Sequence, residues 1–97
     1  MASYIILANW TEKGFHELKD SPARLDEFKA LCQEHGGHIL AFYMTMGPYD
    51  MVIILEAPDD ATVARLALMG GMQGNTRSLT LKAFSEHEYR QIVGSLG

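Results

Sequence analysis

The chain contains a single cysteine, Cys32, among its 97 residues, so no disulfide can form within it. It also has no apolar run near the roughly 20 residues that a helix needs to cross a bilayer, which argues against a membrane partner. The first residues show neither the basic segment nor the cleavage site of a secretory signal. Together these features predict a protein of the reducing cytoplasm.

Positive charge is scarce as well. Lys and Arg number 8 against 12 Asp and Glu, which gives a formal net charge of −4. The cationic side chains are scattered along the chain rather than clustered. Because the neutralisation of phosphates supplies most of the affinity for nucleic acids, this composition argues against a nucleic-acid partner.

Motifs that hold metals, phosphates or cofactors are also missing. The four histidines form no pair at helical ligand spacing, and no cysteine or carboxylate pattern accompanies them. The Gly70-Gly71 and Gly74 cluster lacks the Lys-Ser/Thr of a phosphate-binding loop, and there is no nucleophile elbow and no Cys-x-x-Cys. No metal and no cofactor is therefore expected.

What remains is an ordinary globular composition, with 47% hydrophobic and 21% charged residues, in a chain short enough for one domain over residues 1–97. Apolar runs at residues 4–10, 38–46, 50–56 and 76–84 predict four strands. A helical turn is expected at 15–19. One helix is predicted to begin at a Ser21 cap, with charged residues such as Arg24 on its solvent side. Two further helices are predicted, one from Asp59-Asp60 and one from a capping box at Ser85.

The predicted order is β-α-β-β-α-β plus a C-terminal helix. This is the ferredoxin-like plan of an α+β protein, an antiparallel four-stranded sheet with two helices on one face. Regular alternation puts Leu40 and Phe42 on one face of the second strand, and Ile39, Ala41 and Tyr43 on the other. The strands are apolar on both faces, and monomers rarely expose large apolar patches. A second copy is therefore expected to cover the open face and to form a dimeric α+β barrel.

The connection between the second and third strands is the most informative segment. Gly47-Pro48 separates two apolar runs, and Tyr49-Asp50 follows at once. Such residues suit a tight hairpin, in which Asp50 accepts backbone hydrogen bonds and fixes the register. In the functional alternative, Asp50 is a carboxylate in the space between two sheets and Tyr49 is a hydroxyl at its rim. The turn-shaping role is favoured, because Asp is a habitual turn residue.

The residues Gly47, Tyr49 and Asp50 resemble the Gly-x-Tyr-Asp signature of the GYD-domain family. Further segments resemble that family's pattern in the same order along nearly the whole chain: Asn9-Trp10-Thr11 with Gly14, Lys19-Asp20-Ser21-Pro22 with Arg24, Gly36-Gly37, Glu56-Ala57-Pro58-Asp59, and Gly74-Asn75 with Arg77. The resemblance implies a ferredoxin-like fold of the dimeric α+β-barrel group and no defined activity. Similar hairpins occur in the effector-binding domains of leucine-responsive regulators, and related barrels include cofactor-free monooxygenases and small isomerases. Fold alone does not fix function.

The candidate ligand contacts are six: Asn9, Trp10, Tyr43, Tyr49, Asp50 and Arg77. Asn9 ends a central strand, where a buried amide needs hydrogen-bond partners. A role in holding the following loop is favoured over a contact with a ligand. Arg77 can bind an anion through two N–H groups, although a surface ion pair is its commoner role. If the protein is an enzyme, His38, Tyr49 and Asp50 supply its acid and base groups.

Three functions stay open at this level. The first is a homo-oligomeric domain in a regulatory or accessory role, which binds a small, partly apolar or anionic ligand between the sheet and the helices or at the dimer interface. The second is a cofactor-free barrel enzyme, monooxygenase- or isomerase-like, and the third is an oligomerisation module with no ligand. An enclosed cavity that faces Asp50 or His38 would favour the enzyme. A filled interior, with Asp50 bonded only to its own turn, would favour the structural module.

Overall fold

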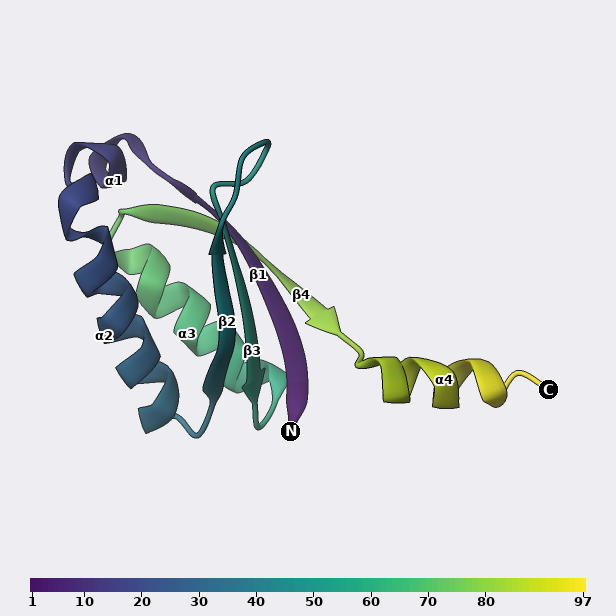
Figure 1. Cartoon of the computed structure of the whole chain (residues 1–97). Helices are drawn as coiled ribbons and strands as arrows, with labels where there is room; N and C mark the ends of the chain where they lie inside the picture. Colours follow the sequence, from purple (N-terminus) through teal and green to yellow (C-terminus); the bar gives the residue numbers. More distant parts are fainter.

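The computed structural model describes all 97 residues (Figure 1). The elements follow in the order β1 (Ala2–Trp10), α1 (Glu12–His16), the 3₁₀ helix η1 (Leu18–Asp20), α2 (Ser21–Glu34), β2 (His38–Met44), β3 (Met51–Ala57), α3 (Asp60–Met72), β4 (Thr76–Ala83) and α4 (Glu86–Gly94). Apart from α1 and η1, which occupy the region of the expected helical turn, this is the predicted order. None of the helices combines the length and the apolar composition that crossing a membrane demands.

The four strands form one antiparallel sheet in the order β2-β3-β1-β4. In Figure 1, α2 and α3 lie on the same side of this sheet. The predicted α+β fold, with a ferredoxin-like strand order and two helices on one face, is therefore confirmed. The structure contains one chain, so the dimer stays a prediction.

The core lies between the sheet and the helices α2 and α3. Every second residue of β1 and β3 is buried on this side, and the helices close it mainly with Cys32, Val63 and Leu66. Leu55 and Leu66 have no exposed surface. Burial of a side chain of this size contributes roughly 1.5–3 kcal/mol, which makes this layer the main source of stability.

Strand β2 departs from regular alternation, because a β-bulge lies between Ile39 and Ala41. Ile39 pairs with Leu55, and Phe42 pairs with Ile53. Residues that pair directly share a face, so Ile39 and Phe42 both face the helices. The sequence predicted opposite faces for these two residues. That prediction was wrong, because the bulge adds one residue to β2 and reverses the alternation beyond it.

The opposite side of the sheet, called the open face here, is not covered by any helix. Its register pairs Ile5 with Leu81 and Leu7 with Leu79 across β1 and β4. Leu79 and Leu81 remain 47% and 40% exposed. The apolar residues of the open face are Ile5, Leu7, Tyr43, Val52, Ile54, Leu79 and Leu81.

The start of α2 also differs from the prediction. Ser21 is the first helical residue rather than the cap, and Asp20 at the cap position makes no side-chain capping bond. The Ser21 hydroxyl instead accepts a hydrogen bond from the Trp10 indole N–H at 3.2 Å, which explains why it does not cap. The caps of α3 by Asp59 and of α4 by the Ser85 capping box are as predicted.

Helix α4 extends away from the rest of the chain (Figure 1). It makes no extensive contact with any other element. Its apolar side chains Tyr89, Ile92 and Val93 are 58%, 46% and 48% exposed. With this helix the chain measures 53 × 31 × 18 Å, so it is markedly elongated.

Candidate functional site

Asn9 holds the hairpin between β2 and β3 against the end of β1. The Asn9 side-chain amide donates to the Pro48 carbonyl at 3.1 Å, and its Oδ1 accepts from the Asp50 backbone N–H at 2.9 Å. In return, the Asp50 carboxylate accepts a hydrogen bond from the Trp10 backbone N–H at 3.1 Å. These reciprocal bonds from side chain to backbone fix how the hairpin sits on β1.

The hairpin connection is longer than the sequence predicted, because β2 ends at Met44 and β3 begins only at Met51. Thr45 closes the loop: its hydroxyl donates to the Tyr49 carbonyl at 2.6 Å, and its backbone N–H donates to the Asp50 carbonyl at 2.7 Å. Gly47 has a φ of +121°, in a region that residues with a side chain rarely adopt. The signature glycine therefore supplies a backbone conformation.

Of the other predicted contacts, Arg77 lies beside this network, because it pairs with Asn9 in the register of β1 and β4, and its side chain is exposed. Tyr43 is 60% exposed on the open face. His38 begins β2, whereas Asp50 lies beyond the other end of that strand. The 7 residues of β2 span roughly 20 Å at about 3.3 Å per residue. Within one chain, His38 and Asp50 therefore do not come together as an acid/base pair.

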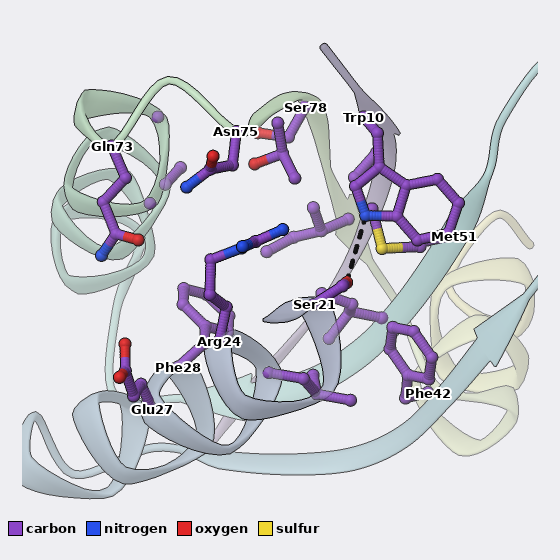
Figure 2. A pocket seen from close by; sticks show the side chains of 18 of the residues that line it. Trp10, Ser21, Arg24, Glu27, Phe28, Phe42, Met51, Gln73, Asn75 and Ser78 are labelled. Carbon is purple, nitrogen blue, oxygen red and sulfur yellow. Dashed lines mark hydrogen bonds between the residues drawn. The ribbon is translucent and has the colours of Figure 1, made fainter. Parts of the chain in front are cut away.

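A cavity of about 610 Å³ lies between the sheet and the helices α2 and α3. Its walls are mostly apolar and include the rings of Trp10, Phe28 and Phe42 and the side chain of Met51 (Figure 2). Among the six ligand contacts predicted from the sequence, only Trp10 lines it. The cavity is thus a separate site from the signature hairpin, and Trp10 belongs to both.

Two polar atoms at this cavity have no hydrogen-bond partner. The Arg24 guanidinium donates through Nη1 to the Glu17 carbonyl at 3.2 Å, but its Nη2 is buried and unpartnered. Asn75 is only 7% exposed, and its Oδ1 is buried without a partner. Figure 2 shows both side chains on the same side of the cavity. An unsatisfied buried polar group costs about 1–3 kcal/mol, so two of them at one cavity favour the entry of a molecule, water or ligand, that pairs with them.

The backbone around Asn75 is held by the start of α1. The Thr11 backbone N–H donates to the Asn75 carbonyl at 3.0 Å, and the Thr11 hydroxyl donates to the Gly74 carbonyl at 2.6 Å. A Cβ atom on Gly14 would lie 2.1 Å from the Asn75 carbonyl oxygen, so only glycine permits this approach. The position of Asn75 therefore depends on contacts between segments that are far apart in the sequence.

Trp10 connects the cavity with the signature hairpin. Its indole N–H donates to Ser21 in the first turn of α2, and its ring meets that of Phe15 edge-on, with the centroids 5.6 Å apart. Its backbone N–H holds the Asp50 carboxylate. These contacts fix the indole at the cavity wall, as Figure 2 shows for the bond to Ser21.

Arg24 and Asn75 are the site residues that the sequence did not predict. The helical pattern placed Arg24 on the solvent side of α2, and the structure corrects this. Arg24 lies three residues after Ser21 and four before Phe28, a spacing that puts all three on one helix face. This spacing was an available signal. Asn75 gives none, because its burial depends on the long-range contacts of Thr11.

Titratable groups elsewhere are buried for structural reasons. The Tyr4 hydroxyl donates to the Asp60 carboxylate, and burial followed by this hydrogen bond raises the pKa of Tyr4 to about 12. Cys32 is a buried free thiol, and its burial raises the pKa of that thiol. A thiol in such surroundings is inert at neutral pH. No three His, Cys, Asp or Glu side chains gather in a way that could hold a metal ion.

Comparisons with known proteins agree with the fold. The GYD domain family model matches residues 4–93. A curated Thermus thermophilus protein, named glutamine synthetase and cystathionine beta-lyase binding protein, is 37% identical over 84 residues, which cover 86% of this chain and 88% of the relative. The crystal structure of TTHA0845 from the same species has a TM-score of 0.55 at 20% identity, covering 88% of this chain and 95% of that one, so this likeness concerns the fold alone. As the resemblance of Gly47, Tyr49 and Asp50 predicted, the chain belongs to the GYD domain family.

Proposed function

We propose that the chain is a small homo-oligomeric binding domain in a regulatory or accessory role, which takes a small, partly apolar or anionic ligand in the cavity. The composition of the cavity carries this proposal, because apolar walls surround an unpartnered guanidinium nitrogen and an unpartnered amide oxygen. A mostly apolar lining with a few placed polar groups is typical of sites for small molecules.

A cofactor-free enzyme, monooxygenase- or isomerase-like, is less well supported. Acid–base catalysis requires a titratable group within hydrogen-bond reach of the substrate. His38, Tyr49 and Asp50 do not line the cavity, and a guanidinium such as that of Arg24 offers only hydrogen-bond donors. Glu27 is the remaining charged residue of the lining, and it is exposed. A purely structural module is also less well supported, because close-packed interiors rarely keep a cavity of this size.

The proposed oligomer is a dimer that pairs the open faces of two copies. Leu79 and Leu81 on β4 and Tyr43 on β2 are substantially exposed there. A monomer rarely leaves such a contiguous apolar surface in water, and a two-fold, sheet-on-sheet packing buries it.

Helix α4 supports the same assembly. A helix of 9 residues is marginal in water unless its apolar face is buried, yet α4 makes no extensive contact within its own chain. We propose that the second copy covers α4 as part of the same interface.

The proposed partners include other enzymes. The curated relative is named for binding glutamine synthetase and cystathionine beta-lyase, and it shares 37% identity with this chain over 84 residues. If purified glutamine synthetase shows no binding to the chain in interferometry at micromolar concentrations, this part of the proposal fails. The proposed compartment is the cytoplasm, whose reducing conditions suit the buried free thiol of Cys32.

Sedimentation equilibrium tests the dimer. The wild-type chain of 10.8 kDa is expected to sediment at twice that mass at micromolar concentration. Leu79→Glu is expected to give a folded monomer, because it puts a charge on the open face. Leu68→Glu is the matched control, since Leu68 is 69% exposed on α3, away from that face. A wild-type mass of one chain would refute the dimer.

A further inference from the structure

The polar end of the cavity is cationic. Arg24 takes part in no salt bridge, and its Nη2 carries N–H donors that no protein atom accepts. The bond from Nη1 to the Glu17 carbonyl holds the head group in place. Ser21 and Pro22 of the first turn of α2 line the same cavity, and the N-terminus of a helix favours negative charge. A partly buried guanidinium at such a position, with its Nη2 unpartnered, suits a carboxylate.

One guanidinium also limits how much negative charge the site can hold. Glu27 is the only other charged residue of the lining, and it adds a negative charge. The whole chain carries a net charge of −4. A doubly charged phosphate needs more donors than this lining offers, whereas a single carboxylate is matched by Arg24 alone.

Asn75 adds a second requirement. Its buried Oδ1 is a hydrogen-bond acceptor, and the residue lies on the same side of the cavity as Arg24 (Figure 2). A ligand satisfies this oxygen only if it carries an O–H or N–H group. Since the carboxylate itself lies on Arg24, the donor belongs on a neighbouring carbon of the ligand.

The remaining walls of the cavity suit an apolar part of the ligand. Phe28, Phe42 and Met51 offer rings and a thioether, without further unpartnered polar atoms. The cavity of about 610 Å³ falls within the range of roughly 300–1,000 Å³ that is common for small-molecule sites. It easily accommodates a molecule of the size of an amino acid.

We infer that the cavity binds a small apolar acid with a hydrogen-bond donor beside its carboxylate, that is, an aliphatic 2-hydroxy or 2-amino acid. The carboxylate lies on Arg24, the hydroxyl or amino group on Asn75 Oδ1, and the apolar side chain against Phe28 and Phe42. This inference rests on the proposed ligand-binding function and adds the chemical class of the ligand.

Titration of the full chain with four matched probes tests the inference. Two carry acid and donor, namely 4-methyl-2-hydroxypentanoate and leucine. The plain acid 4-methylpentanoate lacks the donor, and the neutral 4-methylpentan-1-ol lacks the charge. Calorimetry measures the affinities, and the NMR signal of the Trp10 indole N–H reports whether the cavity is occupied. At least one of the first two probes is expected to bind about tenfold more tightly than the plain acid and the alcohol.

Two arginine variants provide the matched comparison. Arg24→Met is expected to weaken the better probe by about tenfold or more, because it removes a charge-assisted hydrogen bond. Arg65→Met, at an exposed arginine of α3 outside the cavity, is expected to leave the affinity unchanged. If Arg24→Met does not fold, Arg24→Lys keeps the charge without the planar fork, and a loss of affinity is again expected.

Each outcome separates the inference from the proposed function. If the alcohol binds as tightly as the acids, the assigned chemical class is wrong, and ligand binding in the cavity stands. If the plain acid matches the better probe, the role of Asn75 is wrong. If no probe moves the Trp10 signal at about 10 mM, the inferred chemical class is overturned, whereas ligand binding in the cavity and the dimer remain separate questions.

Discussion

Asp50 illustrates how one residue of a family signature can serve the fold. Its carboxylate accepts the Trp10 backbone N–H, and its own backbone N–H is bonded to Asn9. Both bonds cross from the hairpin to β1, and neither points into the cavity. At this position the side chain serves as a hydrogen-bond acceptor, a role that involves no proton transfer.

Asp50→Ala is expected to lower the free energy of unfolding by about 1.5–3 kcal/mol, the range for a lost hydrogen bond to a charged group. Asp50→Asn is expected to cost clearly less, because an amide oxygen can still accept from Trp10. Urea unfolding followed by circular dichroism measures both, with the exposed Asp26→Ala as the control. Stability equal to that of the wild type in Asp50→Ala would contradict the structural role.

At the scale of elements, helix α3 depends on an ionised cap. The Asp59 side chain accepts hydrogen bonds from the Thr62 hydroxyl at 2.7 Å and from the Thr62 backbone N–H at 2.9 Å. The side-chain bond, followed by the backbone bond, lowers the pKa of Asp59 below its ordinary value of 3.8. Folding therefore favours the charged form of this residue.

A lowered pKa in the folded state means that the stabilisation is complete above the unfolded pKa and is lost as the pH falls through the folded one. The wild type is therefore expected to lose more stability than Asp59→Asn between about pH 5 and pH 2, since asparagine caps without titrating. Chemical unfolding across this range measures the difference, and Glu34→Gln on α2 is the control. Parallel pH profiles for the wild type and Asp59→Asn would show that the cap does not titrate as described.

The elements also show what a sequence can and cannot predict. Strand order and the two caps followed from local signals, because alternation and capping residues act over a few positions. The bulge between Ile39 and Ala41 did not, since no glycine marks it and it shows only in the pairing with β3. The polar residues of the cavity, Arg24 and Asn75, were missed for the same kind of reason. Asn75 is buried by Thr11, and the indole of Trp10 draws Ser21 away from its capping role.

At the scale of the whole molecule, α4 makes the chain unusually long for its size. The helix has an apolar side and a polar side, yet the apolar side faces water in the single chain. An arm of this kind is stable only when another surface covers it. The dimer proposed above provides that surface on the second copy.

Ile92→Asp is expected to weaken the dimer by about tenfold or more, because burial of an isoleucine contributes roughly 1.5–3 kcal/mol. Gln91→Asp, one position away, introduces the same charge without removing an apolar side chain. Analytical ultracentrifugation over a dilution series measures both dissociation constants. If Ile92→Asp and the wild type dissociate alike, α4 does not pack on the second copy.

The place of Trp10 has a practical consequence. It is the only tryptophan of the chain, and its indole forms part of the cavity wall while its backbone holds the signature hairpin. The tryptophan emission of the chain, excited selectively beyond the absorption of its four tyrosines, therefore originates at one residue beside the space that a ligand would occupy. A molecule that displaces water from the indole changes the wavelength of that emission. Tryptophan fluorescence therefore reports binding in the cavity without an added label.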